Sequence, residues 1–193
     1  TCTNSDTIPV EVYCQPIANF TYTPGCVDSL ITFQNSAING TGIITQFDWN
    51  FGDGVTDTVQ NPSHNYLTDG SYTATLMVTT DSGCTDTTSR TVIVYPVPNV
   101  DFSVANVCLY DSAHFFDNTQ INSGNLALWY WDFGDGNSST MQNPAHLYGS
   151  SGTYNITLIV VSDKSCVDTL SKSLVIHPVP IAEFSKQNQF TRK

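Results

Sequence analysis

The sequence predicts an all-β protein built from two tandem antiparallel β-sandwiches. Three observations carry this prediction. Apolar and polar residues alternate with period two in several segments, which is typical of half-buried strands. Thr and Ser are abundant whereas Ala, Leu, Glu and Lys are few, and this composition favours strand over helix. Finally, the chain repeats itself: Trp49 recurs 82 positions later as Trp131, with the residues around it.

The repeat divides the chain into domains. The segments Trp49–Gly54 and Gln60–Tyr66 recur at the same offset as Trp131–Gly136 and Gln142–Tyr148. The same offset relates Cys26 to Cys108, Cys84 to Cys166, and Pro96-Val-Pro98 to Pro178-Val-Pro180. Residues 17–97 and 98–180 are therefore expected to be two equivalent domains. Residues 1–16 are expected to be the last strand of a preceding repeat, and 181–193 the start of a following repeat or a tail. Pro-Val-Pro restricts the backbone, so the linkers are expected to be short and stiff.

The strands follow from the apolar positions within each repeat. Phe47, Trp49 and Phe51 alternate with polar residues, as do the apolar residues of 72–78 and 92–94. Each set has an equivalent in the second repeat, and Gly-Asp-Gly turns separate the strands. This pattern predicts about seven short strands per repeat, packed as a sandwich with an aromatic inner face.

Charge and hydropathy exclude two classes of partner. The 193 residues carry 17 acids against 6 cations, a net charge of −11, and Arg90 is the only Lys or Arg before residue 164. So few cations cannot neutralise phosphates, which makes nucleic acid an improbable partner. Apolar runs such as Leu158–Val161 are far shorter than the roughly 20 residues that span a bilayer, so membrane insertion is not expected.

Three motifs in order, WDFGDG, NPxHxY and GxYxVxLxV, resemble those of the PKD domain, an immunoglobulin-like sandwich. Both repeats carry them, so the resemblance covers nearly the whole chain. Asn50 replaces the usual Asp of the first motif, and His114 stands where Val or Ile is usual. Tyr72 and Tyr154 resemble the tyrosine corner of such sandwiches. The fold class expected is therefore tandem PKD-like sandwiches.

Matched spacing predicts two disulfides. Cys26 and Cys84 are 58 positions apart, as are Cys108 and Cys166, so we expect the bonds Cys26–Cys84 and Cys108–Cys166. Loops of that length would stabilise each domain by roughly 4 kcal/mol and imply an oxidising compartment. A zinc site is disfavoured because no CxxC or HxxxH spacing occurs. Cys2 lies 82 positions before Cys84, which is the repeat offset, so it would bond a cysteine of a preceding repeat. Alternatively, it pairs with Cys14 or stays free.

The sequence does not predict an enzyme or a resident cofactor. Asp53 and Asp135 lie between glycines in repeated turns, where acids are usually structural. His64 and His146 lie in NPxHxY, where a hydrogen-bonded structural imidazole is expected. No GxSxG segment or separate Ser, His and Asp set indicates a nucleophile.

Calcium is the metal to consider. Asp101 and Glu183 follow the Pro-Val-Pro linkers, and carboxylates near a domain junction suit a hard cation. The alternative is that both acids are simply solvated, since no EF-hand-like loop is present.

A three-residue pattern suggests glycosylation. Asp followed by Ser or Thr and then an aliphatic residue or Thr resembles the O-glycosylation sequon of Bacteroidetes-type bacteria. Its hydroxyl residues are Thr7, Ser29, Thr58, Thr87, Ser112 and Thr169. The alternative is an ordinary turn-to-strand entry.

The expected function is a non-catalytic, extracellular structural or adhesive repeat segment, a stalk or filament of a secreted bacterial surface protein. Its partners would be neighbouring repeats, a glycan or protein ligand on a surface, or copies of itself paired at sheet edges. The alternative function is an accessory polysaccharide- or protein-binding module of a secreted hydrolase. For such a module the outward aromatic candidates are Tyr130 and Tyr110, because Trp49, Trp131 and Trp129 share the inward parity of their strands.

Overall fold

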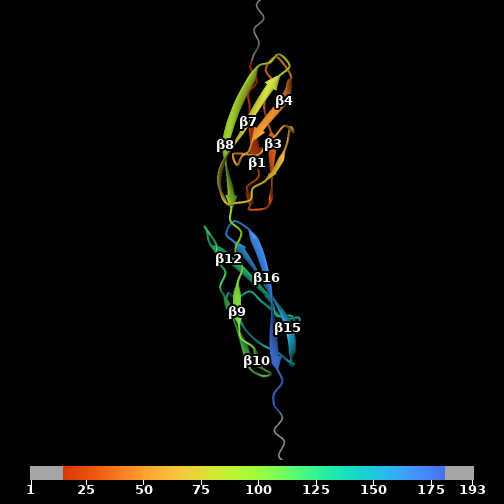
Figure 1. The fold of residues 1–193 in the computed structure, drawn as a ribbon, viewed down its shortest axis with the longest axis vertical. Helices are drawn as coiled ribbons and strands as arrows, with labels where there is room; N and C mark the ends of the chain where they lie inside the picture. The colour runs from red at the N-terminus through yellow and green to blue at the C-terminus, as the bar shows by residue number, and fades with distance from the viewer. Residues whose placement is uncertain (1–14, 181–193) are drawn as a thin grey trace, which may run out of the picture. The chain divides into compact units, whose positions relative to one another are not determined.

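The computed structural model describes residues 15–180, and these form strands and loops without a helix (Figure 1). The chain divides into two compact units between Val97 and Pro98, which is also where the repeat divides it. Residues 1–14 and 181–193 lie outside the described residues. The expectations for Cys2, Thr7, Cys14 and Glu183 fall there, with those for the terminal segments.

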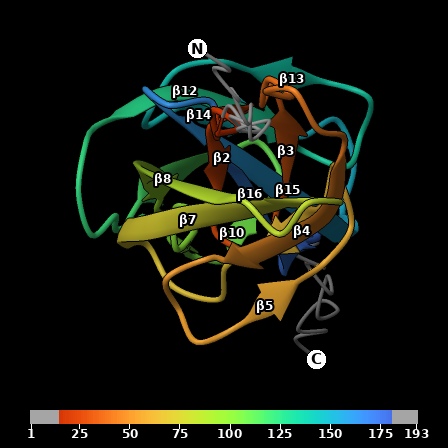
Figure 2. The same cartoon turned by 90° about the horizontal axis from the view of Figure 1, so that it is seen from above.

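Unit 1 is a sandwich of a three-stranded and a five-stranded sheet. Its strands are β1 (Phe20–Tyr22), β2 (Gly25–Cys26), β3 (Leu30–Asn35), β4 (Ile44–Asn50), β5 (Thr56–Asp57), β6 (Ser63–Asn65), β7 (Gly70–Thr80) and β8 (Thr85–Tyr95). The sheet orders are β1-β3-β6 and β2-β8-β7-β4-β5. Figure 2 shows the broad β7 and β4 of the larger sheet, with β5 beyond β4.

Unit 2 repeats this arrangement. Its strands are β9 (Phe102–Val104), β10 (Val107–Cys108), β11 (Ser112–Asp117), β12 (Leu126–Asp132), β13 (Ser138–Ser139), β14 (Ala145–Leu147), β15 (Gly152–Ser162) and β16 (Val167–His177). The sheet orders are β14-β11-β9 and β10-β16-β15-β12-β13. The all-β fold of tandem sandwiches predicted from the sequence is confirmed.

The two units share one register. Trp49 pairs with Leu76 across β4 and β7, and Trp131 pairs with Leu158 across β12 and β15. Each of these ladders contains a β-bulge at the equivalent place, after Ile44 and after Leu126. The bulge changes which side chains face outward beyond it. Most strands pair antiparallel, whereas β2 with β8 and β10 with β16 form short parallel pairs.

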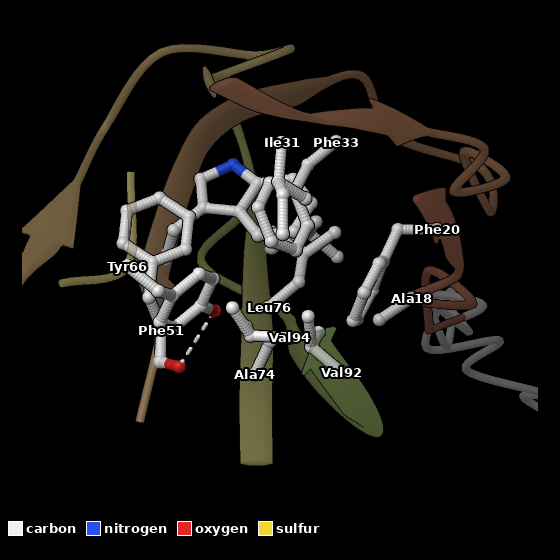
Figure 3. Close-up of a cluster of buried hydrophobic side chains, with 12 residues drawn as sticks. Ala18, Phe20, Ile31, Phe33, Phe51, Tyr66, Ala74, Leu76, Val92 and Val94 are labelled. Atoms are coloured by element: carbon white, nitrogen blue, oxygen red, sulfur yellow. Dashed lines mark hydrogen bonds between the residues drawn. The ribbon is translucent and has the colours of Figure 1, made fainter. Parts of the chain in front are cut away.

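Each unit buries one aromatic core. In unit 1, Phe20 and Phe33 pack between the sheets with Leu76 and Val92 (Figure 3). Trp49 belongs to the same buried cluster. Most positions that the alternation predicted to face inward are buried, and unit 2 buries their equivalents. Phe47 and Tyr72 are only half-buried and pack against the edge of the core. Both core tryptophans also satisfy their indole N–H. Trp49 Nε1 donates to the Val59 carbonyl and Trp131 Nε1 to the Met141 carbonyl, each over 3.0 Å.

The Gly-Asp-Gly turns are held by side chains. The Gly52 amide donates to Asn50 Oδ1 over 2.8 Å, and the Val55 amide to Asp53 Oδ1 over 3.1 Å. Unit 2 repeats the first bond with Asp132 in place of Asn50. An amide oxygen and a carboxylate oxygen can both accept this bond, which explains why the motif tolerates Asn50.

Both tyrosine corners predicted from the sequence are present. Tyr72 Oη donates to the Thr68 carbonyl over 2.9 Å, and Tyr154 Oη to the Ser150 carbonyl over 3.0 Å. Each bond ties the start of a long strand to the loop before it. The short loop that follows NPxHxY is thereby tied to the strand after it.

Candidate functional site

A histidine and an aspartate pair inside each unit. His64 Nε2 lies 2.6 Å from Asp53 Oδ2, and His146 Nε2 lies 2.7 Å from Asp135 Oδ2. Asp53 comes from the Gly-Asp-Gly turn and His64 from β6, so the pair joins the two sheets. Because an ionised carboxylate only accepts hydrogen bonds, Nε2 carries the proton.

Aromatic rings enclose each imidazole. The His64 ring stacks on Phe51 at 4.3 Å between centroids and 4° between planes, and it meets Tyr66 edge-on at 4.5 Å. Tyr66 itself is buried and donates its hydroxyl to the Phe51 carbonyl over 2.9 Å (Figure 3). Unit 2 repeats the stack with Phe133, His146 and Tyr148. The ring faces of both histidines are therefore covered by protein.

The environment sets the pKa of two groups in this cluster. Burial acts to raise the pKa of Asp53, but hydrogen bonds from His64 and the Val55 amide outweigh it and hold that pKa below the ordinary value of 3.8. Asp135 behaves in the same way in unit 2. Burial raises the pKa of the Tyr66 hydroxyl. The aspartates thus stay ionised as structural acceptors, and the expectation of a hydrogen-bonded structural imidazole is confirmed.

A groove lies on the outer side of the larger sheet in unit 2. Its volume is about 470 Å³, and its lining residues are Ala127, Leu128, Trp129, Tyr130, Thr140, Gln142, Ile159 and Val161. On the adjacent strands β12 and β15, Leu128 lies opposite Val161, and Tyr130 lies opposite Ile159. Leu128 is 64% exposed and Tyr130 46%, so apolar surface here is open to solvent. None of the lining side chains is charged.

Asp117 fixes two of the groove's side chains from the opposite sheet. Its Oδ2 accepts from Trp129 Nε1 over 2.7 Å and from Gln142 Nε2 over 3.0 Å. The shared carboxylate orients the indole ring and the amide together. Side chains that are already ordered favour binding, because the entropy cost of ordering them is not added when a ligand binds. Trp129, expected to face inward, is half-buried: it packs against the core and also lines the groove.

Unit 1 has polar residues where this groove would be. Gln46 and Asp48 take the places of Leu128 and Tyr130, and Thr79 takes the place of Val161. Gln46 Nε2 donates to Asp48 Oδ1 and Oδ2 over 3.1 and 2.8 Å. The apolar outer face therefore distinguishes unit 2. The signal was present in the sequence, because comparing outward positions of the two repeats identifies it.

The expected disulfide pairs are wrong. Cys26 and Cys166 are disulfide-bonded, whereas Cys84 and Cys108 are free. Cys26 faces Tyr95 at the end of β8, but Cys84 directly precedes the start of that strand. Eleven strand residues separate the two positions. At roughly 3.3 Å per residue they lie about 35 Å apart, far beyond the roughly 7 Å that a disulfide allows between Cα atoms.

The same geometry excludes a bond between Cys108 and Cys166. Cys108 faces His177 at the end of β16, and Cys166 precedes the start of this 11-residue strand. Equal spacing of the cysteines identified the repeat correctly, but it did not show whether the two cysteines of one repeat lie close together in space. The two cysteines of each repeat lie at opposite ends of a sandwich.

The Asp101 side chain pairs with a cation. Asp101 Oδ1 lies 2.6 Å from Lys172 Nζ, and the hydrogen bond from Lys172 holds the pKa of Asp101 below its ordinary value. Within residues 15–180, no three His, Cys, Asp or Glu side chains group to hold a metal ion. Calcium binding at Asp101 therefore stays a prediction.

The Asp-Ser/Thr sites lie mostly at the surface. Thr58, Thr87, Ser112 and Thr169 are exposed, whereas Ser29 is half-buried and donates to the Cys26 carbonyl over 2.7 Å. The aspartates that precede Thr87 and Thr169 have a structural role. Asp86 accepts the Ala18 amide and Asp168 accepts the Val100 amide, so each aspartate holds the first segment of its unit. The turn-to-strand role is therefore real, and glycosylation stays a prediction.

Within residues 15–180 no helix is long and apolar enough to cross a membrane.

Comparison with known proteins shows the family. The family model described as "PKD domain" matches residues 14–95 and 94–177. The chain therefore belongs to the PKD domain family and contains two tandem copies.

Similar proteins include bacterial proteases. The "Pre-pro-metalloprotease PrtV" of Vibrio cholerae serotype O1 is 28% identical over 140 residues, 72% of this chain and 15% of that protein. "Collagenase ColQ1" of Bacillus cereus is 32% identical over 73 residues, 38% of this chain and 8% of that protein. This chain thus spans a small part of the length of either relative.

Solved PKD domains are also similar. The PKD1 domain of Vibrio cholerae metalloprotease PrtV is 34% identical, covering 42% of this chain and 98% of that domain, with a TM-score of 0.40. The PKD1 domain of Vibrio anguillarum Epp is 26% identical, covering 43% of this chain and 96% of that domain, with a TM-score of 0.41.

Proposed function

We propose that this chain is a non-catalytic, extracellular repeat segment, serving as a stalk or filament of a secreted bacterial surface protein. The observation that carries the proposal is the position-for-position repetition of a self-contained sandwich. Each unit buries its own core of twelve residues. Disulfide-bonded cysteines support an oxidising, extracellular location.

The polar groups that could do chemistry support a structural role. His64 and His146 are covered on their ring faces and paired with turn aspartates. Across the described residues every buried side-chain nitrogen and oxygen has a hydrogen-bond partner. A residue committed to such contacts is not available as a nucleophile or base without disrupting the turn.

Edge pairing between chains would have to use short strands. The outer strands of each five-stranded sheet have two residues each, and those of each three-stranded sheet have three. Short edges offer few free backbone groups for a neighbouring chain. A filament is therefore better served by end-to-end than by lateral contacts.

Force spectroscopy tests the stalk proposal. The segment is pulled from its two ends in reducing buffer. We expect two unfolding events, each releasing on the order of 25 nm of chain, since one repeat extends roughly 3.6 Å per residue. Unfolding of both units in a single event, or extension without a measurable force, would contradict a tension-resistant repeat.

The groove of unit 2 favours a second function, an accessory binding module of a secreted hydrolase. We propose an extended, apolar protein segment as its ligand. Four of the lining side chains are aliphatic, namely Ala127, Leu128, Ile159 and Val161, and this apolar strip runs along two paired strands, which suits an extended apolar segment. Relatives named as a metalloprotease and a collagenase add support, since both names denote action on proteins.

Converting the groove into its unit 1 equivalent tests this function. The double variant Leu128→Gln/Tyr130→Asp copies Gln46 and Asp48. We expect the natural chain to bind immobilised collagen or gelatin and the double variant to lose about tenfold or more in affinity. Leu147→Gln, an exposed position outside the groove lining, is the matched control and should bind normally. Binding to chitin or cellulose instead, or unchanged binding by the double variant, would contradict the proposal.

A further inference from the structure

Each unit carries one cysteine near each end of its last strand. In unit 1, Cys26 pairs with Tyr95, the last residue of β8, and Cys84 directly precedes Thr85, the first. In unit 2, Cys108 and Cys166 hold the same positions on β16. The length of the strand prevents the two cysteines of one unit from bonding to each other.

These two ends are where the chain enters and leaves a unit. Ala18, just before β1, donates its amide to Asp86 Oδ2 over 2.7 Å, two residues from Cys84. Cys26 instead faces Tyr95, the residue before Pro96. Unit 2 has the equivalent contacts, Val100 to Asp168 and Cys108 to His177. Cys84 and Cys166 are therefore entry cysteines, and Cys26 and Cys108 are exit cysteines.

Each kind of cysteine occurs once bonded and once free, in the same backbone setting. The Cys84 amide donates to Thr80 Oγ1 over 3.1 Å, and the amide of bonded Cys166 donates to Ser162 Oγ over 3.1 Å. The residue after Cys26 donates to the Tyr95 carbonyl, and the residue after Cys108 donates to the His177 carbonyl. The free cysteines are thus held like their bonded equivalents.

We propose that Cys84 and Cys108 are linkage sites for another PKD repeat, joined by a disulfide between the exit cysteine of one repeat and the entry cysteine of the next. Along a tandem chain the exit end of one repeat precedes the entry end of its successor, so we expect the bond to join an exit cysteine to an entry cysteine. Cys108 is exposed and Cys84 is half-buried, so both thiols are accessible from outside their unit. The linking repeat belongs either to a longer chain or to a second copy.

The bond forms by thiol–disulfide exchange with a small disulfide such as oxidised glutathione. The Cys108 thiolate attacks this disulfide, forming a mixed disulfide and releasing one glutathione thiolate. The Cys84 thiolate of the other repeat then attacks the Cys108 sulfur and releases the second glutathione. Two protein thiols are oxidised and one small disulfide is reduced to two thiols.

A second copy of the chain is the first probe. The purified protein is incubated in glutathione redox buffer and analysed by non-reducing electrophoresis. We expect a ladder of covalent multimers that collapses on reduction. Cys84→Ser and Cys108→Ser should each remain monomeric alone, and an equal mixture of the two should form dimers only, because each supplies the thiol the other lacks. Matched thermal unfolding of the variants establishes that they are folded.

Peptide mapping by mass spectrometry identifies the bond. A cross-linked pair containing Cys84 and Cys108 supports the proposal for a second copy. In a longer form of the protein, Cys84 or Cys108 bonded to the complementary cysteine of an adjacent repeat supports the same linkage within one chain. Bonds of Cys84 to Cys84 or Cys108 to Cys108, multimers joined through Cys2 or Cys14, or no multimer with both thiols free in the longer form would overturn it.

Discussion

Units 1 and 2 share a core but differ on an outer face. The twelve buried positions of each core correspond one to one, and Phe20, Phe33, Trp49, Phe51, Tyr66, Leu76 and Val78 keep their residue type or a close apolar substitute. On the outside of β4 and β12, by contrast, Gln46 and Asp48 become Leu128 and Tyr130. Inner positions are limited by close packing, whereas outer ones can change at small cost.

The cores also exchange volume between two positions. Unit 1 has Ile31 and Ala74, and unit 2 has Ala113 and Ile156 at the equivalent places. A gain at one position accompanies a loss at the other, so the summed volume of these two side chains is kept. This is the kind of substitution that cores tolerate best.

The largest effect is expected from the core tryptophans. Trp49→Ala and Trp131→Ala should each destabilise their unit by about 3 to 5 kcal/mol, because each removes a fully buried ring and leaves a cavity. Denaturant unfolding followed by circular dichroism measures this. Trp129→Ala is the comparison and should cost less, since that ring is half-buried. A loss confined to one of the two core variants would mean that the units are not equivalent.

The Gly-Asp-Gly turn offers a matched pair of glycines. Gly52 and Gly54 both have positive φ, 86° and 98°, but a Cβ on Gly52 would lie 2.6 Å from the Thr73 carbonyl oxygen, whereas one on Gly54 meets nothing within 4 Å. Gly54→Ala should therefore cost about 1 to 2 kcal/mol from backbone strain alone. Gly52→Ala should cost clearly more, because a backbone atom cannot move aside. Equal melting temperatures for the two variants would contradict this reading.

The volume exchange predicts coupling between two substitutions. Ile31→Ala should destabilise unit 1 by about 2 to 4 kcal/mol, and Ala74→Ile by about 1 to 3 kcal/mol. The double variant, which copies unit 2, should be destabilised by at least about 1 kcal/mol less than the two single costs together. Strict additivity in a double-mutant cycle would show that the two positions do not compensate each other.

The smallest effect concerns pH. The folded pKa of Asp53 is below its ordinary value, so the stability from its bonds is complete above about pH 4 and is lost as pH falls toward the folded pKa. Asp53→Asn should destabilise the protein at neutral pH by about 1 to 2 kcal/mol. The free energy of unfolding of this variant should also decrease less as pH is lowered. Asp135→Asn is the matched variant in unit 2, and an unchanged acid limb in both variants would rule out these carboxylates as its source.

The sequence by itself determined the repeat, the strands and the core. Period-two alternation of apolar residues decides which side of a strand is buried, and this needs only local information. The tyrosine corners are also local. Each connects residues four positions apart, so the motif was enough to predict them.

The tertiary structure alone decided three features that depend on distant segments. His64 bonds to Asp53 because the fold brings β6 of one sheet next to the turn after β4 of the other. Trp129 and Gln142 are linked because both donate to the carboxylate of Asp117, which lies on the opposite sheet. The cysteine pairing failed for the same reason. Equal spacing between Cys26 and Cys84 cannot reveal that an 11-residue strand holds them at opposite ends of one sandwich.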